Sequence, residues 1–194
     1  MGRLHVNMNI TLDGVIQANG GPTIQDGDFA YAEWEQPFWD AEAGAQIDED
    51  VQACDALLLG RITYDIFRAY WPGKTDTIGH VFDRVPKYVA SRGDADLSWE
   101  TSTQLSDVAT EVRALREQHE QIHTWGSADL LQTLFREDLV DQVNLWMCPV
   151  VLGEGKRLFP EGTTPSRFEP LEPPRSYPAG VTLLRYRRLG RLDR

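Results

Sequence analysis

Three short segments of the chain carry glycine, hydroxyl and arginine groups of the kinds that bind phosphate oxygens. We refer to them by number as the 60–63, 91–92 and 126–127 segments. Their relevant residues are Gly60, Arg61, Thr63, Ser91, Arg92, Gly126 and Ser127. A glycine lets backbone N–H groups approach a ligand closely, and guanidinium and hydroxyl groups donate hydrogen bonds to phosphate. Each segment alone is typical of an ordinary turn, so the prediction of a phosphate site depends on their convergence.

The elements that must position these segments alternate between strands and helices. Apolar or alternating runs predict strands at residues 4–12, 55–59, 87–90, 122–125, 142–148 and 181–186. Helical periodicity follows Gly60, Ser106 and Ser127. This order predicts an α/β fold with a mostly parallel sheet, helices on both faces and antiparallel strands at the C-terminal edge. Ligands bind such sheets at the carboxyl ends of the strands, where the three segments are expected to meet.

Finer features of these elements can also be predicted. The strand at 4–12 alternates apolar and polar residues and is expected to bury one face only. Ser106 is expected to cap the helix that follows it. The helix after Gly60 is expected to turn four side chains inward, those of Ile62, Ile66, Phe67 and Tyr70.

Size and composition indicate one globular domain spanning residues 1–194. Apolar residues make up 41% of the chain and charged residues 25%, which is ordinary for a globular protein. The formal net charge of -11 argues against nucleic-acid and anionic-membrane partners, so a bound phosphate must be held by local groups. The sequence shows neither a signal-peptide pattern nor a long apolar span, and we expect a cytoplasmic protein. Cys54 and Cys148 are expected to be buried, reduced thiols.

Three phosphate-binding segments on neighbouring strands match the extent of a dinucleotide. Such a cofactor carries a pyrophosphate, and NADPH adds a 2′-phosphate. Arg92 or Arg61 would select that extra phosphate because a guanidinium binds phosphate through two parallel hydrogen bonds. The residues therefore predict NADPH rather than NADH.

Segments in the order that marks the dihydrofolate reductase fold stand at 57–64, 87–92, 125–127 and 149–159. The chain resembles more closely the branch related to the C-terminal reductase domain of the bifunctional riboflavin-biosynthesis deaminase/reductase, whose opening motif matches residues 11–14. The resemblance runs from about Leu4 to Tyr186, and 149–159 is its most specific part. It implies an NADPH-dependent reductase for a small molecule, usually a homodimer, that needs no metal or prosthetic group.

The resemblance also implies roles for individual residues. The 60–63 segment would contact cofactor phosphates, the 91–92 segment the 2′-phosphate and adenosine, and the 126–127 segment the pyrophosphate. Three residues near the end of the first strand would border the nicotinamide, namely Asn9, Leu12 and Ile16.

Acids that could protonate a substrate are less clearly marked. Dihydrofolate reductases place a carboxylate on an early helix, and the matching region here holds acids in an unfamiliar frame. Asp28 and Glu33 are candidates, with solvation of a helix face as the alternative. Asp13 is a third candidate because it lies at the turn beside the expected hydride site, although Asp-Gly is also an ordinary turn pair.

The resemblance leaves the substrate open. The riboflavin reductases usually carry Glu-Gly-Gly before the helix, whereas this chain has Thr124, Trp125 and Gly126. The indole is expected to reshape the nicotinamide pocket. The substrate could be that of 5-amino-6-(5-phosphoribosylamino)uracil reductase, a pterin, or another heterocycle, imine or carbonyl. A non-catalytic NADPH-binding module is the further alternative.

A different chemistry is suggested by His119 and His123, which form an H-E-x-x-H pattern. Two histidines one helical turn apart can bind zinc in a hydrolase. Trp125 and Gly126 follow at once, however, and no third histidine comes later in the chain. In the α/β fold predicted above, His123 belongs to a strand and His119 to a helix end.

Overall fold

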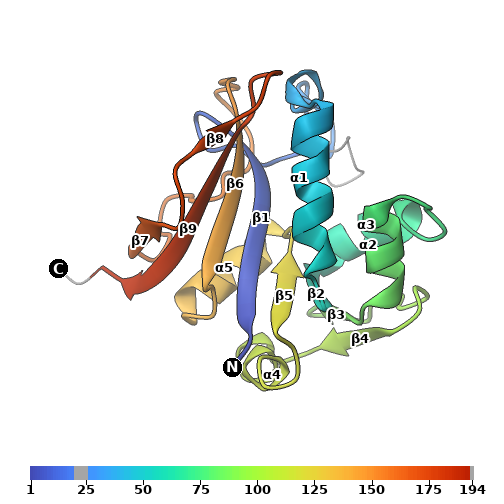
Figure 1. Ribbon diagram of the computed structural model, residues 1–194. Helices are drawn as coiled ribbons and strands as arrows, with labels where there is room; N and C mark the ends of the chain where they lie inside the picture. The colour runs from blue at the N-terminus through green and yellow to red at the C-terminus, as the bar shows by residue number, and fades with distance from the viewer. Residues whose placement is uncertain (20–25, 193–194) are drawn as a thin grey trace.

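The computed structural model describes residues 1–19 and 26–192, which build one nine-stranded sheet and its covering helices (Figure 1). The strands are β1 (Arg3–Thr11), β2 (Ala56–Gly60), β3 (Lys87–Ala90), β4 (Ser102–Leu105), β5 (Gln121–Thr124), β6 (Gln142–Cys148), β7 (Ser166–Pro170), β8 (Arg175–Ser176) and β9 (Thr182–Arg191). The helices are α1 (Ala41–Gln52), α2 (Arg61–Tyr70), α3 (Thr77–Arg84), α4 (Val108–Leu115) and α5 (Ala128–Arg136), with a 3-10 turn η2 (Gln36–Phe38).

The strands follow the order β4-β3-β2-β5-β1-β6-β9-β7, with β8 pairing with β9. Pairing is parallel from β4 to β6 and antiparallel between β9 and each of β6, β7 and β8. The predicted α/β class with an antiparallel C-terminal edge is therefore confirmed. Because β1, β2, β3 and β5 all run the same way, their carboxyl ends lie at one edge of the sheet.

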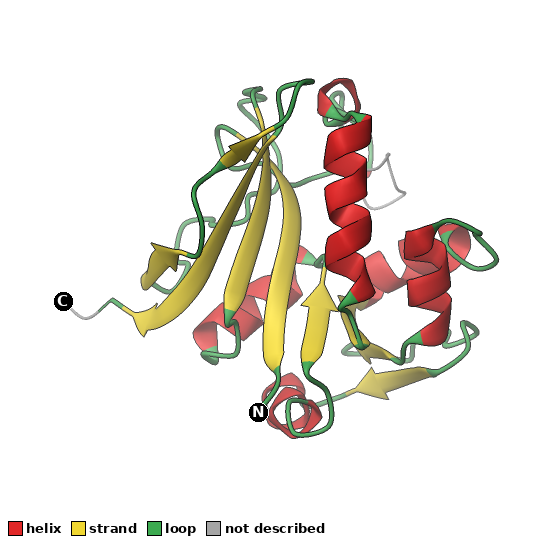
Figure 2. Cartoon of the chain, viewed as in Figure 1, coloured by secondary structure: helices red, strands yellow, loops and turns green. Residues whose placement is uncertain are grey.

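Helices cover both faces of the sheet (Figure 2). On one face, α4 and α5 bury apolar side chains against Leu4, Val6 and other residues of β1. On the other face, α1, α2 and α3 enclose a second core that includes Val51, Tyr64 and Phe82. This double coverage explains why the continuously apolar strand β2 is buried along its whole length.

The strand β1 is buried on both faces, so the prediction of a single buried face was wrong. His5 and Asn7 are only 8% and 4% exposed, on the face opposite to the core formed with α4 and α5. Asn144 donates from Nδ2 to Asn7 Oδ1 at 2.8 Å, and the rings of His5 and His123 stack with centroids 5.0 Å apart. Burial lowers the pKa of His5 to about 4 and that of His123 to about 3. We call these two residues the histidine pair.

The inward face of α2 also differs from the prediction. Tyr64 is fully buried and donates its hydroxyl to Ser102 Oγ at 3.0 Å, whereas Ile66 and Tyr70 are 36% and 56% exposed. Three charged residues, Arg61, Asp65 and Arg68, share one side of this helix, but apolar residues occupy most of the rest of its circumference, so periodicity alone did not identify the buried side. The buried side is set by Tyr64, because a buried phenol requires a hydrogen-bond partner and Ser102 of β4 supplies it.

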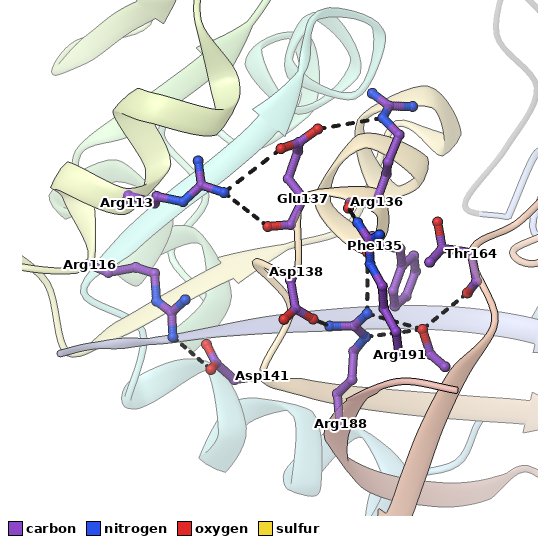
Figure 3. A network of polar contacts seen from close by, with 11 residues as sticks. Arg113, Arg116, Phe135, Arg136, Glu137, Asp138, Asp141, Thr164, Arg188 and Arg191 are labelled. Carbon is purple, nitrogen blue, oxygen red and sulfur yellow. Dashed lines mark hydrogen bonds and ion pairs between the residues drawn. The ribbon is translucent and has the colours of Figure 1, made fainter. Parts of the chain in front are cut away.

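An arginine network holds the C-terminal strand β9 against the end of α5 (Figure 3). The buried Arg188 contacts the Asp138 carboxylate and donates from Nη2 to the Phe135 carbonyl at 3.3 Å and to Ser166 Oγ at 3.1 Å. The bond to the Phe135 carbonyl places a cation at the C-terminal end of α5, where the helix dipole favours positive charge. The network lies next to the amino end of β6, and two of its members, Arg136 and Glu137, also line the cavity described in the next subsection.

Two further expectations concern the whole chain. Cys54 and Cys148 are buried and not disulfide-bonded, as predicted. Within the described residues, no helix is both long enough and apolar enough to cross a membrane.

Candidate functional site

The three predicted phosphate-binding segments meet at the carboxyl edge of the sheet. A cavity of about 690 Å³ lies there, between the starts of α2, α4 and α5 and the loop after β3. The predicted residues that line it are Gly60, Arg61, Ser91, Arg92 and Ser127. Thr63 and Gly126 lie directly behind this lining, because Thr63 Oγ1 is 3.2 Å from Ser127 Oγ and Gly60 donates its N–H to the Gly126 carbonyl at 2.9 Å.

The two helices that begin at the ends of β2 and β5 lack the caps that the other α-helices have. Helices α1, α3 and α4 each begin with an aspartate whose carboxylate accepts backbone N–H groups, namely Asp40, Asp76 and Asp107. Asp107 thus takes the capping position that we predicted for Ser106. By contrast, Gly60 at the start of α2 and Ser127 at the start of α5 provide no side-chain cap. The first N–H groups of these helices remain available to an anion.

Gly60 is required by a close approach of two turns. A Cβ atom at this position would lie 2.5 Å from Ser127 Oγ and 2.7 Å from the Ser127 backbone nitrogen. Gly126 adopts a φ of +118°, which favours glycine, and the Gly126–Ser127 peptide bond is cis. A side chain at position 60 would therefore separate the two uncapped helix ends.

Two of the three arginines that line the cavity lie close to a carboxylate, and the third does not. Arg61 pairs with Asp65 at 2.8 Å, and Arg136 lies 3.6 Å from Glu137. Arg92 is exposed and makes no ion pair within residues 1–19 and 26–192. It is the cavity-lining cation with its guanidinium free to bind a ligand.

The three residues predicted to border the nicotinamide lie outside this cavity, in β1 and the turn that follows it. Asn9 is half-buried in β1, Leu12 is 58% exposed, and Ile16 is buried. Backbone hydrogen bonds join this turn to the segment after β6, from Leu12 N to the Val150 carbonyl and from Ile16 N to the Lys156 carbonyl, both at 2.9 Å. The candidate nicotinamide side of the site is thus formed by two segments far apart in sequence.

Asp13 lies in the same turn, and donors surround its carboxylate. It accepts hydrogen bonds from Thr11 Oγ1 at 2.6 Å, from Gly153 N at 2.8 Å and from Leu152 N at 3.3 Å. The hydrogen bond from Thr11, with smaller contributions from the backbone, lowers the pKa of Asp13 to about 2. A carboxylate that stays ionised at neutral pH is poorly suited to donate a proton, so these contacts favour a structural role.

The other candidate acids occupy the segment between β1 and α1. Asp28 and Glu33 are exposed. Glu35, which we did not single out from the sequence, is 4% exposed. Burial and, secondarily, the charge of Glu35 raise the pKa of the Cys148 thiol to about 12. Cys148 ends β6 beside Thr11 of β1, so Glu35 is a buried acid near the carboxyl edge.

Trp125, which replaces the first glycine of the family pattern, contributes to the core under α2 and α3. Its ring centroid lies 5.1 Å from that of Phe82, 5.8 Å from that of His123 and 6.1 Å from that of Phe67. Trp125 does not line the cavity. The indole is thus packed against the core and is not part of the cavity wall.

The structure does not form the helix-borne zinc motif. His119 lies in the turn after α4, where its Nε2 is 2.9 Å from the Tyr88 hydroxyl, and His123 belongs to β5. Among the described residues, no group of three or more histidine, cysteine, aspartate or glutamate side chains is placed to hold a metal ion. The zinc-hydrolase alternative is therefore wrong for these two histidines.

Comparison with known proteins agrees with this geometry. The model of the RibD C-terminal domain family matches residues 3–176. The chain is 27% identical over 166 residues to the uncharacterized protein YyaP of Bacillus subtilis, covering 81% of this chain and 80% of that protein. A pyrimidine reductase-like protein of Corynebacterium diphtheriae superimposes with a TM-score of 0.68 at 14% identity, covering 97% and 92% of the two chains. Dihydrofolate reductase of Enterococcus faecalis, solved with NADP(H), gives a TM-score of 0.61 at 15% identity, with 97% of each chain covered.

Proposed function

Because this chain belongs to the RibD C-terminal domain family, we propose that it is an NADPH-dependent reductase that transfers hydride to a small heterocyclic, imine or carbonyl substrate. We also propose that it works as a homodimer, as the resemblance implies. The observation that supports the proposal most directly is the pair of uncapped helix ends facing one cavity. The aspartate caps of α1 and α3, which start away from the cavity, show that this chain can cap its helices where no ligand is needed.

The residues around the cavity fit a phosphorylated dinucleotide. The backbone N–H groups at the starts of α2 and α5 would hold the pyrophosphate, helped by the Thr63 and Ser127 hydroxyls. Arg92 and Ser91, across the cavity, would hold the 2′-phosphate and adenosine. Such local donors are needed because the chain as a whole carries a formal charge of -11.

When bound, NADPH would supply the hydride, and the protein would supply orientation and a shielded site. The turn after β1, with Asn9, Leu12 and Ile16, would border the nicotinamide. Glu35 is the candidate we favour for holding a proton near the substrate, because it is buried beside the end of β6 whereas Asp28 and Glu33 are exposed.

The test is a binding and turnover series on the whole protein. We expect NADPH to raise the melting temperature more than NADH does, and to be oxidised in the presence of at least one member of a panel of pterins, aminopyrimidines, imines and carbonyls. The panel should include dihydrofolate, because reduction of dihydrofolate alone would identify a pterin reductase. Tight NADPH binding without turnover of any compound would identify a non-catalytic module, and the absence of binding would refute the proposal.

A further inference from the structure

We propose that Asp13 is a positioning residue, whose carboxylate fastens the turn after β1 to the segment after β6 and thereby holds Leu12 and Ile16 at the nicotinamide side of the site. This inference rests on the proposed function, because the two apolar residues have this role only if a dinucleotide binds at the carboxyl edge. It differs from a catalytic role, in which Asp13 itself would exchange a proton with the substrate.

The fastening consists of hydrogen bonds that converge on one carboxylate. One oxygen, Oδ1, accepts from Thr11 Oγ1 at 2.6 Å and from Leu152 N at 3.3 Å, while Oδ2 accepts from Gly153 N at 2.8 Å. Thr11 Oγ1 in turn accepts from Val15 N at 2.8 Å. We call Thr11, Asp13, Leu152 and Gly153 the clasp. The side chain of Asp13 is 18% exposed, so little water competes for these bonds.

Backbone pairing on both sides of the clasp shows that the two segments belong together. Val15 forms a β-bridge with Arg157, and Leu158 N donates to the Gly14 carbonyl at 3.0 Å. Gly155 makes the close approach possible, because a Cβ atom there would lie 2.7 Å from Val15 Cγ1. The clasp therefore adds to backbone contacts that already join the turn after β1 to the segment after β6.

The clasp connects this packing to the proposed chemistry. Leu12 is immediately before Asp13, and its exposed side chain is oriented by a turn whose conformation depends on the carboxylate. Without an acceptor at position 13, two backbone N–H groups and one hydroxyl lose their common partner, and the turn gains alternative conformations. The candidate phosphate-binding segments follow other strands, so they would still bind the cofactor phosphates.

The experiment compares wild type with Asp13→Ala, Thr11→Val, the double variant and Thr11→Ser, with Glu169→Gln as a control that removes a surface ion pair with Arg187. NADPH affinity is measured by titration, and immobilisation of the nicotinamide by the fluorescence enhancement of bound NADPH. Amide hydrogen exchange at Leu152 and Gly153 reports the clasp itself, without any substrate. Thermal melting identifies a variant that fails to fold, in which case Thr11→Val alone decides the outcome.

We expect Asp13→Ala to lose at least half of the fluorescence enhancement, with affinity changed by no more than about threefold and exchange at Leu152 and Gly153 accelerated at least tenfold. Thr11→Val should change the fluorescence and the exchange in the same direction but less, because it removes one of the three hydrogen bonds to the carboxylate. The double variant should be no more impaired than Asp13→Ala, because removal of the carboxylate already removes the bond that Thr11 makes. Thr11→Ser and the control should match wild type.

Unchanged fluorescence and exchange in both single variants would overturn the inference while leaving the proposed function in place. A loss of fluorescence enhancement in Asp13→Ala without faster exchange at Leu152 and Gly153 would overturn it as well, in favour of a direct role for the carboxylate. A wild-type protein that does not bind NADPH would overturn the proposed function, and the role of the clasp with it.

Discussion

Selection of NADPH over NADH should depend on Arg92. The two cofactors differ by the 2′-phosphate alone, and Arg92 is the cavity-lining guanidinium without an ion pair among the described residues. A hydrogen bond between charged groups contributes about 1.5–3 kcal/mol, and exposure of Arg92 favours the lower end of that range. We therefore expect Arg92→Ala to weaken NADPH binding about tenfold and NADH binding less than twofold.

The matched comparison is Arg61→Ala. Arg61 is held by Asp65 and lies next to the 60–63 turn, so its loss should weaken both cofactors to a similar extent. Titration of wild type and of each variant with NADPH and NADH, by calorimetry at two salt concentrations, measures the dissociation constant for every combination. The Arg92 effect should shrink at high salt, because counterions screen an exposed pair. An equal loss of both cofactors in Arg92→Ala would show that this residue does not read the 2′-phosphate.

Three further predictions concern the packing and the acids. Gly60→Ala should destabilise the protein by about 1–3 kcal/mol in urea unfolding and weaken NADPH binding, because the new Cβ would meet Ser127. The control is Gly44→Ala in α1, where a Cβ would have nothing within 4 Å, and it should stabilise the protein by about 0.5–1 kcal/mol. The histidine pair has pKa values of about 4 and 3, below the ordinary 6.5, so its neutral form is favoured in the folded state. Its contribution to the free energy of unfolding should be fully present above pH 6.5 and lost as the pH falls towards 4. For two protons the loss is at most about 2.7 kcal/mol per pH unit. Replacing both histidines by glutamine should remove this part of the pH dependence of the unfolding free energy, measured by urea titration. Glu35→Gln should lower the turnover number at least tenfold, whereas Asp28→Asn and Glu33→Gln should leave it unchanged. Equal turnover in all three variants would exclude Glu35 as the proton-holding residue.

The position of much of the candidate site could be predicted because its residues lie at the ends of strands that the sequence indicates. The apolar run before Gly60 and the run before Gly126 each mark a parallel strand, and parallel strands bring their ends to one edge whatever lies between. The short strands β4, β7 and β8 were missed, because they are only partly buried and lack a strong apolar pattern.

The remaining features depend on contacts between distant segments. Nothing local distinguishes the buried Glu35 from the exposed Glu33, since their burial follows from how the chain crosses the ends of β1 and β6. The clasp likewise joins positions 13 and 153, which no spacing in the sequence connects. Asp107 rather than Ser106 caps α4 because the helix begins one residue later than the pattern suggested.

If NADPH binds as proposed, the missing caps of α2 and α5 would make the stability of this protein depend on the cell's supply of that cofactor. An oxyanion that completes those two helix ends binds the folded chain only, so it shifts the folding equilibrium by an amount that grows with the logarithm of its concentration. At a hundred times the dissociation constant the shift is about 2.7 kcal/mol, a sizeable fraction of the stability of an ordinary domain. A cell depleted of reduced dinucleotide would then contain fewer folded molecules, and the remaining ones would lack the cofactor needed for turnover.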